Sequence, residues 1–125
     1  MRSFLFDTHT LLWASYAPEL LSQRVRDIVA DADNFFTLSH ATIWELSIKV
    51  ARGKLTLPRN FFDEIGNLGY SLLPTALKHF DALRKLPLLH RDPFDRMLIA
   101  QSISENLPLI TCDSEITRYD VETVW

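Results

Sequence analysis

The feature that most constrains this chain is a short apolar run that ends in a carboxylate. Phe4, Leu5 and Phe6 are followed at once by Asp7. A short apolar run with a polar residue at its end is typical of a buried central strand in a parallel sheet. Ligands of open parallel α/β sheets bind at the carboxyl ends of the strands. Asp7 is therefore expected at a ligand-binding edge, and further acids at that edge would indicate a divalent-metal site.

Apolar segments of strand length alternate with segments of helical periodicity along the whole chain. Strands are expected at 3–6, 35–38, 70–73, 107–111 and 121–124. Helices are expected at 10–16, 19–32, 39–53, 58–68, 75–83, 92–105 and 114–119. This alternation predicts an α/β fold with a central, mostly parallel sheet of about five strands flanked by helices. No repeat or long linker divides the sequence, so one domain over residues 1–125 is expected.

Three helix ends have clear local signals. Ser39 is expected to cap the helix that follows it, and Gly53 to terminate that helix. Asp92 followed by Pro93 is a strong helix start, because the carboxylate accepts backbone N–H bonds and proline fits the first turn. These signals place the acids that follow them on defined turns of a helix.

The composition excludes several classes of protein. With 125 residues, 47% hydrophobic and 23% charged, the chain has the balance of a globular domain rather than of a disordered one. Its net charge of −3 argues against binding duplex DNA by overall charge. Only three glycines occur, and no phosphate-binding glycine loop is among them. The single Cys112 is expected as a strand residue in a reducing compartment, and no apolar run has the length of a membrane span, so a cytoplasmic protein is expected.

Four acids lie at the ends of predicted strands or on helices that can face the same sheet edge. They are Asp7, Glu45, Asp95 and Asp113. Mg²⁺ and Mn²⁺ prefer oxygen ligands, and hydrolysis of a phosphodiester suits such a site. Crowded carboxylates also raise one another's pKa, so a bound cation would relieve their repulsion.

Each of these acids also has a purely structural explanation. Asp7 and Asp113 could be turn residues, since aspartate is favoured after strands. Asp95 could stabilise a helix start by about 0.3–1 kcal/mol. Glu45 could pair with Lys49 four residues later, worth about 0.2–0.5 kcal/mol. Singly, therefore, none of the four identifies a site.

Five segments together carry a resemblance to a known family. They are Phe6–His9 with Leu11–Trp13, Ser39–Lys49, Gly53–Pro58, His90–Gln101 and Leu109–Asp113. In this order they resemble the PIN domain, and within it the VapC-type toxins of prokaryotic toxin–antitoxin pairs. The resemblance implies a Mg²⁺- or Mn²⁺-dependent endoribonuclease, a homodimer in many members, and a cognate antitoxin protein that covers the site.

The resemblance also assigns roles by matching position. Asp7, Asp95 and Asp113 would hold metal directly or through water, and Glu45 would orient the attacking water or activate it as a base. Thr8 and Thr111 fall where the family often has a small hydroxyl residue that could hold a metal-bound water. Asp92 keeps its capping role, with a supporting role beside the metal possible.

Basic residues and histidines near these segments have less defined roles. Arg96 is expected to pair with Asp92 four residues earlier, with a phosphate contact as the second interpretation. Lys49 begins the densest basic stretch, which also contains Arg52, Lys54 and Arg59. It is either a solvated face or one wall of a groove for RNA. His9 is expected to point away from Asp7, and the histidines lack zinc-ligand spacing.

Two other functions remain open from sequence. A catalytically silent binding module would use the acids only to bind a partner's arginines. A phosphatase with an aspartyl-phosphate intermediate would use Asp7 as nucleophile. Such enzymes usually carry a second aspartate two residues later, where this chain has His9. A receiver-like domain is weaker still, because no acceptor aspartate follows the third predicted strand.

Overall fold

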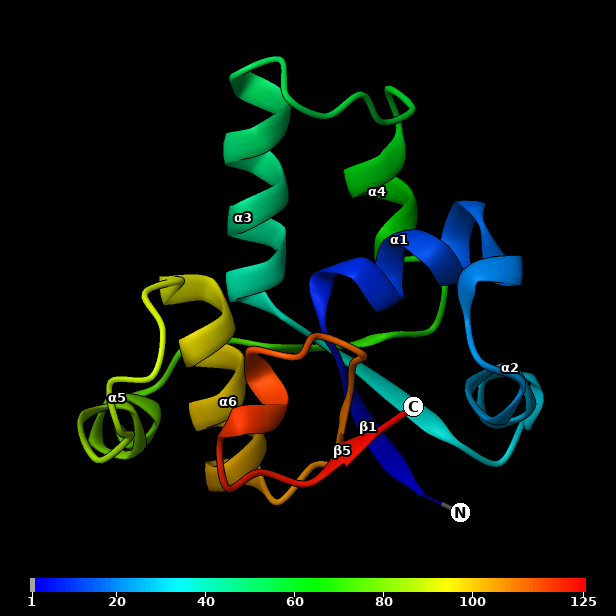
Figure 1. Cartoon of the computed structure of the whole chain (residues 1–125). Helices are drawn as coiled ribbons and strands as arrows, with labels where there is room; N and C mark the ends of the chain where they lie inside the picture. The colour runs from blue at the N-terminus through cyan, green and yellow to red at the C-terminus, as the bar shows by residue number, and fades with distance from the viewer. Residues whose placement is uncertain (1) are drawn as a thin grey trace.

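The first strand lies at the centre of a five-stranded sheet. In the computed structural model, which describes residues 2–125, the strand order is β3-β2-β1-β4-β5 and every pair is parallel (Figure 1). The strands are β1 (Ser3–Phe6), β2 (Phe35–Ser39), β3 (Ser71–Leu73), β4 (Leu109–Ile110) and β5 (Thr123–Val124). The predicted α/β fold is confirmed, and the sheet is wholly rather than mostly parallel.

Helices cover both faces of this sheet and extend beyond its carboxyl edge (Figure 1). The α-helices are α1 (Thr8–Tyr16), α2 (Gln23–Ala30), α3 (His40–Ala51), α4 (Phe61–Ile65), α5 (Leu77–Arg84) and α6 (Pro93–Glu105). Two 3-10 turns are η1 (Pro18–Leu20) and η2 (Ile116–Arg118). No helix among residues 2–125 combines the length and apolar character that crossing a membrane requires.

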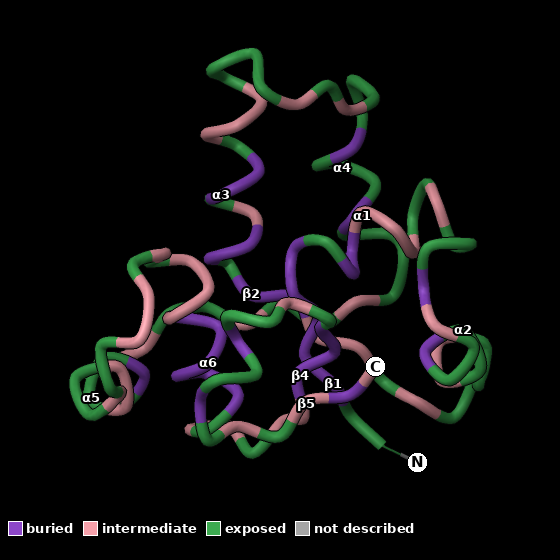
Figure 2. The backbone as a smooth tube through the Cα atoms, in the orientation of Figure 1, coloured by how far each residue is buried: buried purple, intermediate pink, exposed green. Residues whose placement is uncertain are grey.

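Strand β1 divides the core into two clusters. Its side chains point alternately to opposite faces, and Phe4, Leu5 and Phe6 are all fully buried (Figure 2). Phe4 and Phe6 pack with residues of α1, α2 and α4, whereas Leu5 packs with Leu98 of α6 and Ile116 of η2. Burial on both faces explains why this strand reads as a continuous apolar run.

The predicted helix ends are confirmed. The Ser39 hydroxyl accepts the backbone N–H of Ala41 at 2.9 Å and begins α3. Gly53 follows that helix with a φ of 71°, a left-handed conformation that glycine adopts without steric cost. Asp92 caps α6, which therefore begins where the sequence indicates.

Three predicted helices and the predicted place of Cys112 differ in the structure, and the strands expected at 107–111 and 121–124 are shortened to Leu109–Ile110 and Thr123–Val124. The single helix expected at 19–32 is wrong, because the chain turns at Leu21 and the Ser22 hydroxyl caps a separate α2 through Val25 N–H at 3.1 Å. The helix expected at 58–68 covers only Phe61–Ile65, and the one expected at 114–119 is a 3-10 turn. Cys112 is exposed beyond the end of β4, so its expected place in a strand is also wrong.

Candidate active site

Asp7 lies at the junction of β1 and α1 and is held by groups from two elements. It caps α1, with Oδ1 accepting the Thr10 backbone N–H at 2.7 Å. Its Oδ2 accepts the hydroxyl of Thr111, which follows β4, at 2.5 Å. The side chain is only 4% exposed. Burial raises the pKa of Asp7, and the hydrogen bonds from Thr10 and Thr111 partly oppose that rise.

Glu45 reaches the same edge from the second turn of α3. It is buried, and its Oε1 accepts the Thr8 hydroxyl at 2.7 Å. Its Oε2 pairs with Lys49 Nζ at 2.7 Å, which is the expected pairing four residues apart. Thr8 directly follows Asp7, so this hydroxyl connects the first acid to the second. The carboxylate is fixed in one orientation by a donor on each oxygen.

The start of α6 supplies two more acids with different roles. Asp92 Oδ1 accepts the backbone N–H groups of Phe94 and Asp95 at 2.9 and 3.0 Å, as a helix cap does. The Asp95 side chain is free of this capping duty and lies 3.3 Å from His90 Nε2. Asp92 therefore positions the backbone of the turn, while Asp95 presents its carboxylate.

Asp113 follows β4 in a loop that Thr111 helps to hold. Its backbone N–H donates to the Thr111 hydroxyl at 3.1 Å, and its own Oδ1 accepts the Glu115 N–H at 2.8 Å. Thr111 thus contacts Asp7 through its hydroxyl hydrogen and Asp113 through its oxygen. The side chain of Asp113 is half-buried beside the other acids.

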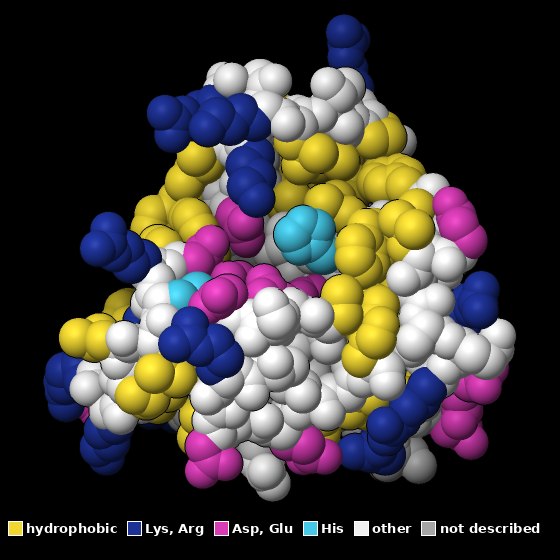
Figure 3. Space-filling view, viewed as in Figure 1, with side chains coloured by type: hydrophobic (Ala, Val, Ile, Leu, Met, Phe, Trp, Pro, Cys, Tyr) yellow, Lys and Arg dark blue, Asp and Glu magenta, His cyan; other side chains and the backbone are white. Residues whose placement is uncertain are grey.

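Three of the acids lie close enough to Asp95 to act on its charge. Its pKa is raised from an ordinary 3.8 to about 6, first by burial and then by the charges of Asp92, Asp113 and Glu45, while His90 opposes the rise. Asp92 shares the helix start of Asp95, whereas Glu45 and Asp113 come from α3 and from the loop after β4. Figure 3 shows Asp and Glu side chains gathered in a hollow of one face, with Lys and Arg side chains on its rim. We call this region the acidic hollow, formed by Asp7, Glu45, Asp92, Asp95 and Asp113.

The donor set of the acidic hollow fits a hard divalent cation. Carboxylate and hydroxyl oxygens are what Mg²⁺ and Mn²⁺ prefer, and a cation would neutralise the repulsion that adds to burial in raising the pKa of Asp95. Within residues 2–125, however, no three His, Cys, Asp or Glu side chains already stand close enough to enclose one ion. Such a donor set suits an ion that takes one or two carboxylates and keeps several waters, as Mg²⁺ does.

The basic side chains are placed differently from one another. Lys49 lies at the rim and is 43% exposed, so its ammonium faces both Glu45 and solvent. The expected Arg96–Asp92 pair is wrong: the guanidinium instead donates to Pro87 O at 2.7 Å and to the Tyr119 hydroxyl at 2.9 Å. Two acceptors outside α6 therefore hold this guanidinium in place of the half-buried Asp92 carboxylate. His9 is exposed and lies against the Trp13 ring, with ring centroids 5.7 Å apart.

Two residues beside the acids were missed by sequence reasoning. His90 contacts Asp95, and Tyr119 contacts His90 at 2.7 Å, although His90 was expected only not to bind metal. The nearness of His90 to Asp95 in the sequence was a signal. Tyr119 offered none, because its contact spans 29 residues.

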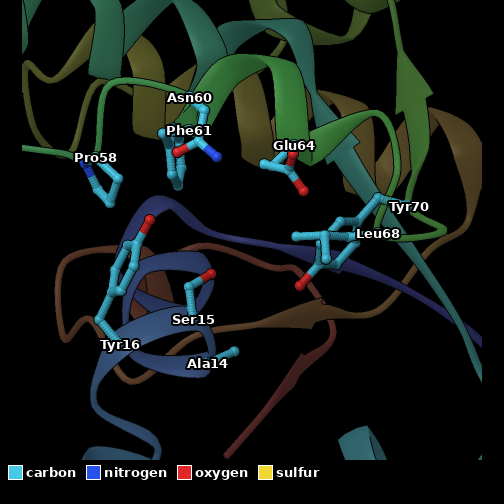
Figure 4. Close-up of a pocket in the computed structure, with 9 residues that line it drawn as sticks. All are labelled: Ala14, Ser15, Tyr16, Pro58, Asn60, Phe61, Glu64, Leu68 and Tyr70. Atoms are coloured by element: carbon cyan, nitrogen blue, oxygen red, sulfur yellow. The ribbon is translucent and has the colours of Figure 1, made fainter.

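A separate groove of about 400 Å³ lies between α1 and α4. Figure 4 shows Tyr16 facing Phe61 and Glu64 across it, with Tyr70 and Leu68 on the side near β3. Glu64 is the only acid that lines it. The groove therefore lacks the clustered carboxylates that cation-dependent hydrolysis needs, and the acidic hollow remains the candidate active site.

Solved structures with a similar fold cover almost the whole chain. VapBC2 from Rickettsia felis, bound to a DNA fragment from its promoter, matches with a TM-score of 0.76 and 16% identity over 98% of this chain and 97% of that one. DNA-bound VapBC from Salmonella typhimurium matches with a TM-score of 0.69 and 17% identity over 100% of this chain and 98% of that one. FitAcB from Neisseria gonorrhoeae matches with a TM-score of 0.69 and 18% identity over 98% of this chain and 96% of that one. At such identities these likenesses establish the fold alone.

The family is established by the sequence itself. No curated protein matches this chain. The model of the PIN domain, in contrast, matches residues 4–122, which include every acid of the hollow. The chain belongs to the PIN domain family.

Proposed function

We propose that this protein is a divalent-metal-dependent endoribonuclease and the toxin of a toxin–antitoxin pair. The observation that carries the proposal is the convergence of Glu45 from α3 and Asp113 from the loop after β4 on Asp92 and Asp95 at the start of α6, in a chain of the PIN domain family. Isolated turn or capping roles would not require these charges to face one another. The similarity to VapBC and FitAcB structures supports an antitoxin partner.

The residues of the acidic hollow divide into binding and proton-transfer roles. Asp7, Asp95 and Asp113 would hold Mg²⁺ or Mn²⁺, directly or through water. When bound, such an ion neutralises phosphate charge and lowers the pKa of water. Glu45, held by Thr8 and Lys49, accepts a proton from the attacking water. The water oxygen then bonds to phosphorus as the bond to the leaving oxygen breaks, and the leaving oxygen keeps the electron pair and takes a proton from solvent.

RNA as the substrate is supported by the rim of the acidic hollow. The chain has a net charge of −3, so contact with a phosphate backbone needs local cations. Lys49 is the rim cation nearest to the acids, because it pairs with Glu45 at 2.7 Å. With Arg52, Lys54 and Arg59 it would neutralise phosphates flanking the bond that is cleaved.

Cleavage of mixed RNA with purified protein tests the proposal. We expect cleavage with Mn²⁺ or Mg²⁺, none with EDTA, and at least about a 100-fold loss in Asp7→Asn, the factor for about 3 kcal/mol of charge stabilisation. Asparagine keeps an oxygen for the Thr10 N–H, so the variant should fold. Asp63→Asn, an exposed change on α4, is the control and should cleave normally.

Two results would reject the nuclease. Cleavage that survives EDTA, or Asp7→Asn cleaving as well as the unchanged protein, removes the role of the acidic hollow. A folded protein that binds a partner but cleaves no RNA with either metal would identify the silent binding module instead. Light scattering tests the homodimer that the family resemblance implies, and fractionation of the native cell tests the expected cytoplasmic location.

A further inference from the structure

His90 connects the acidic hollow to a buried tyrosine. It lies in the loop between α5 and α6, and its side chain is only 11% exposed. Its Nδ1 is 2.7 Å from the Tyr119 hydroxyl, and its Nε2 is 3.3 Å from Asp95 Oδ2. Each ring nitrogen therefore contacts a different partner. In a neutral ring only one nitrogen carries a hydrogen, so a nitrogen that accepts a hydrogen bond leaves the other as the donor.

The surroundings of the Tyr119 hydroxyl determine the direction of these hydrogen bonds. Arg96 Nη1 donates to that oxygen at 2.9 Å, and the His90 backbone N–H donates to it at 3.3 Å. Both are donors only, so they occupy acceptor positions of the oxygen. The single hydroxyl hydrogen is left for His90 Nδ1, which must accept it. The ring then carries its own hydrogen on Nε2, facing Asp95.

We propose that His90 is a positioning residue for Asp95, fixed as its Nε2–H tautomer by the Tyr119 hydroxyl, which Arg96 orients in turn. This inference rests on the proposed function, because it concerns how one of the proposed metal-binding carboxylates is held. The Nε2–H group donates to Oδ2 of Asp95. Among residues 2–125, Asp95 Oδ1 has no hydrogen-bond partner and is left for a cation.

Asp95 needs such a donor because its neighbours repel it. Asp92, Asp113 and Glu45 all act on the Asp95 carboxylate with negative charge. This repulsion disfavours the rotamer of Asp95 that faces the acidic hollow. A directed N–H bond from a ring that is itself fixed restricts that freedom, as the hydrogen-bond partners of metal ligands commonly do.

The competing explanation is that His90 and Tyr119 only tie the loop to η2. The chain offers a control for this explanation. Arg118 Nη1 donates to Leu89 O at 2.9 Å and so ties the same loop to η2 without touching Asp95. If tying the loop were all that mattered, removal of Arg118 would have the same effect as removal of the Tyr119 hydroxyl.

The test measures Mn²⁺ affinity by electron paramagnetic resonance, and RNA cleavage, at one fixed pH. The variants are Tyr119→Phe, His90→Phe, His90→Gln and Arg118→Gln. We expect the two phenylalanine variants to bind Mn²⁺ about 10-fold or more weakly and to lose kcat with little change in KM. His90→Gln keeps an N–H group toward Asp95 and should stay within about 3-fold of the unchanged protein. Arg118→Gln should lower the melting temperature without weakening Mn²⁺ binding.

Three results would overturn the inference. One is unchanged Mn²⁺ affinity in folded His90→Phe, with circular dichroism confirming the fold. The second is an equal loss of affinity in Arg118→Gln, which would assign the effect to the loop. The third is a loss in His90→Gln as large as in His90→Phe. An unchanged protein that neither binds Mn²⁺ nor cleaves RNA would instead reject the proposed function, and this inference with it.

Discussion

Replacing Asp95 by asparagine should stabilise the metal-free protein, and only above acidic pH. Because the pKa of Asp95 in the folded protein is raised from 3.8 to about 6, the folded state prefers the protonated acid. The stability from this preference is fully present below about pH 4 and is lost as the pH rises through about 6. Asparagine has no such charge, so the variant keeps its stability across this range.

The size of the effect follows from the shift. At about 1.4 kcal/mol per pKa unit, a rise from 3.8 to about 6 corresponds to about 3 kcal/mol. The Asp95 side chain is 20% exposed and solvent screens part of its charge, so a gain of about 1.5–3 kcal/mol at pH 8 is expected. Asparagine retains an oxygen for His90 Nε2–H, which limits the loss of contacts.

Urea unfolding in EDTA at pH 4 and at pH 8 measures this gain. The difference in unfolding free energy between Asp95→Asn and the unchanged protein should be small at pH 4 and positive at pH 8. Asp120→Asn, at an exposed position outside the acidic hollow, is the control for removing one negative charge. Added Mn²⁺ at 100 times its dissociation constant should stabilise the unchanged protein by about 2.7 kcal/mol and Asp95→Asn by less. A difference as large at pH 4 as at pH 8, or an equal gain in Asp120→Asn, would refute a pKa of Asp95 raised by burial and by the neighbouring acids.

Three further substitutions test single contacts by urea unfolding. Asp92→Ala removes the acceptor of two N–H groups at the start of α6 and should lower the unfolding free energy by about 1–2 kcal/mol. A loss below about 0.5 kcal/mol would contradict the capping role of Asp92. Thr111→Val removes the hydroxyl that donates to Asp7 and should cost about 1–3 kcal/mol, whereas no loss would contradict this bond as a support of the buried acid. Asn106 follows α6 with a φ of 54°, a backbone conformation that strains alanine but not glycine. Asn106→Ala should therefore lower the unfolding free energy by about 1 kcal/mol and Asn106→Gly should lower it little, so equal losses would exclude backbone strain as the reason.

Local signals made much of the fold predictable. Phe4–Phe6 ending at Asp7 indicated the central strand and its edge, because the apolar run is short and buried on both faces. Ser39, Gly53 and Asp92 marked helix ends through contacts within a few residues, which sequence reasoning can detect. The break at Ser22 was missed because the apolar periodicity continues across it, although its hydroxyl is itself a capping signal.

The candidate site was less predictable because its supporting contacts are distant in sequence. The four acids came from strand ends and from family resemblance, and the structure brings them into one hollow. Helical spacing predicted that Arg96 pairs with Asp92, but its guanidinium donates instead to Pro87 O and to the Tyr119 hydroxyl. The contact of Tyr119 with His90 arises only when η2 folds against the loop before α6. Spacing rules apply within an element and say nothing about such pairs.

The hydrogen bond between Thr111 and Asp7 spans 104 residues. On a ribosome, Asp7 is therefore made 104 residues before the hydroxyl that holds it. The neighbouring strand β4, which pairs with β1, is equally late. A nascent polypeptide therefore has an incomplete acidic hollow until Thr111 and β4 have been made, and a chain cut short before them has no assembled site.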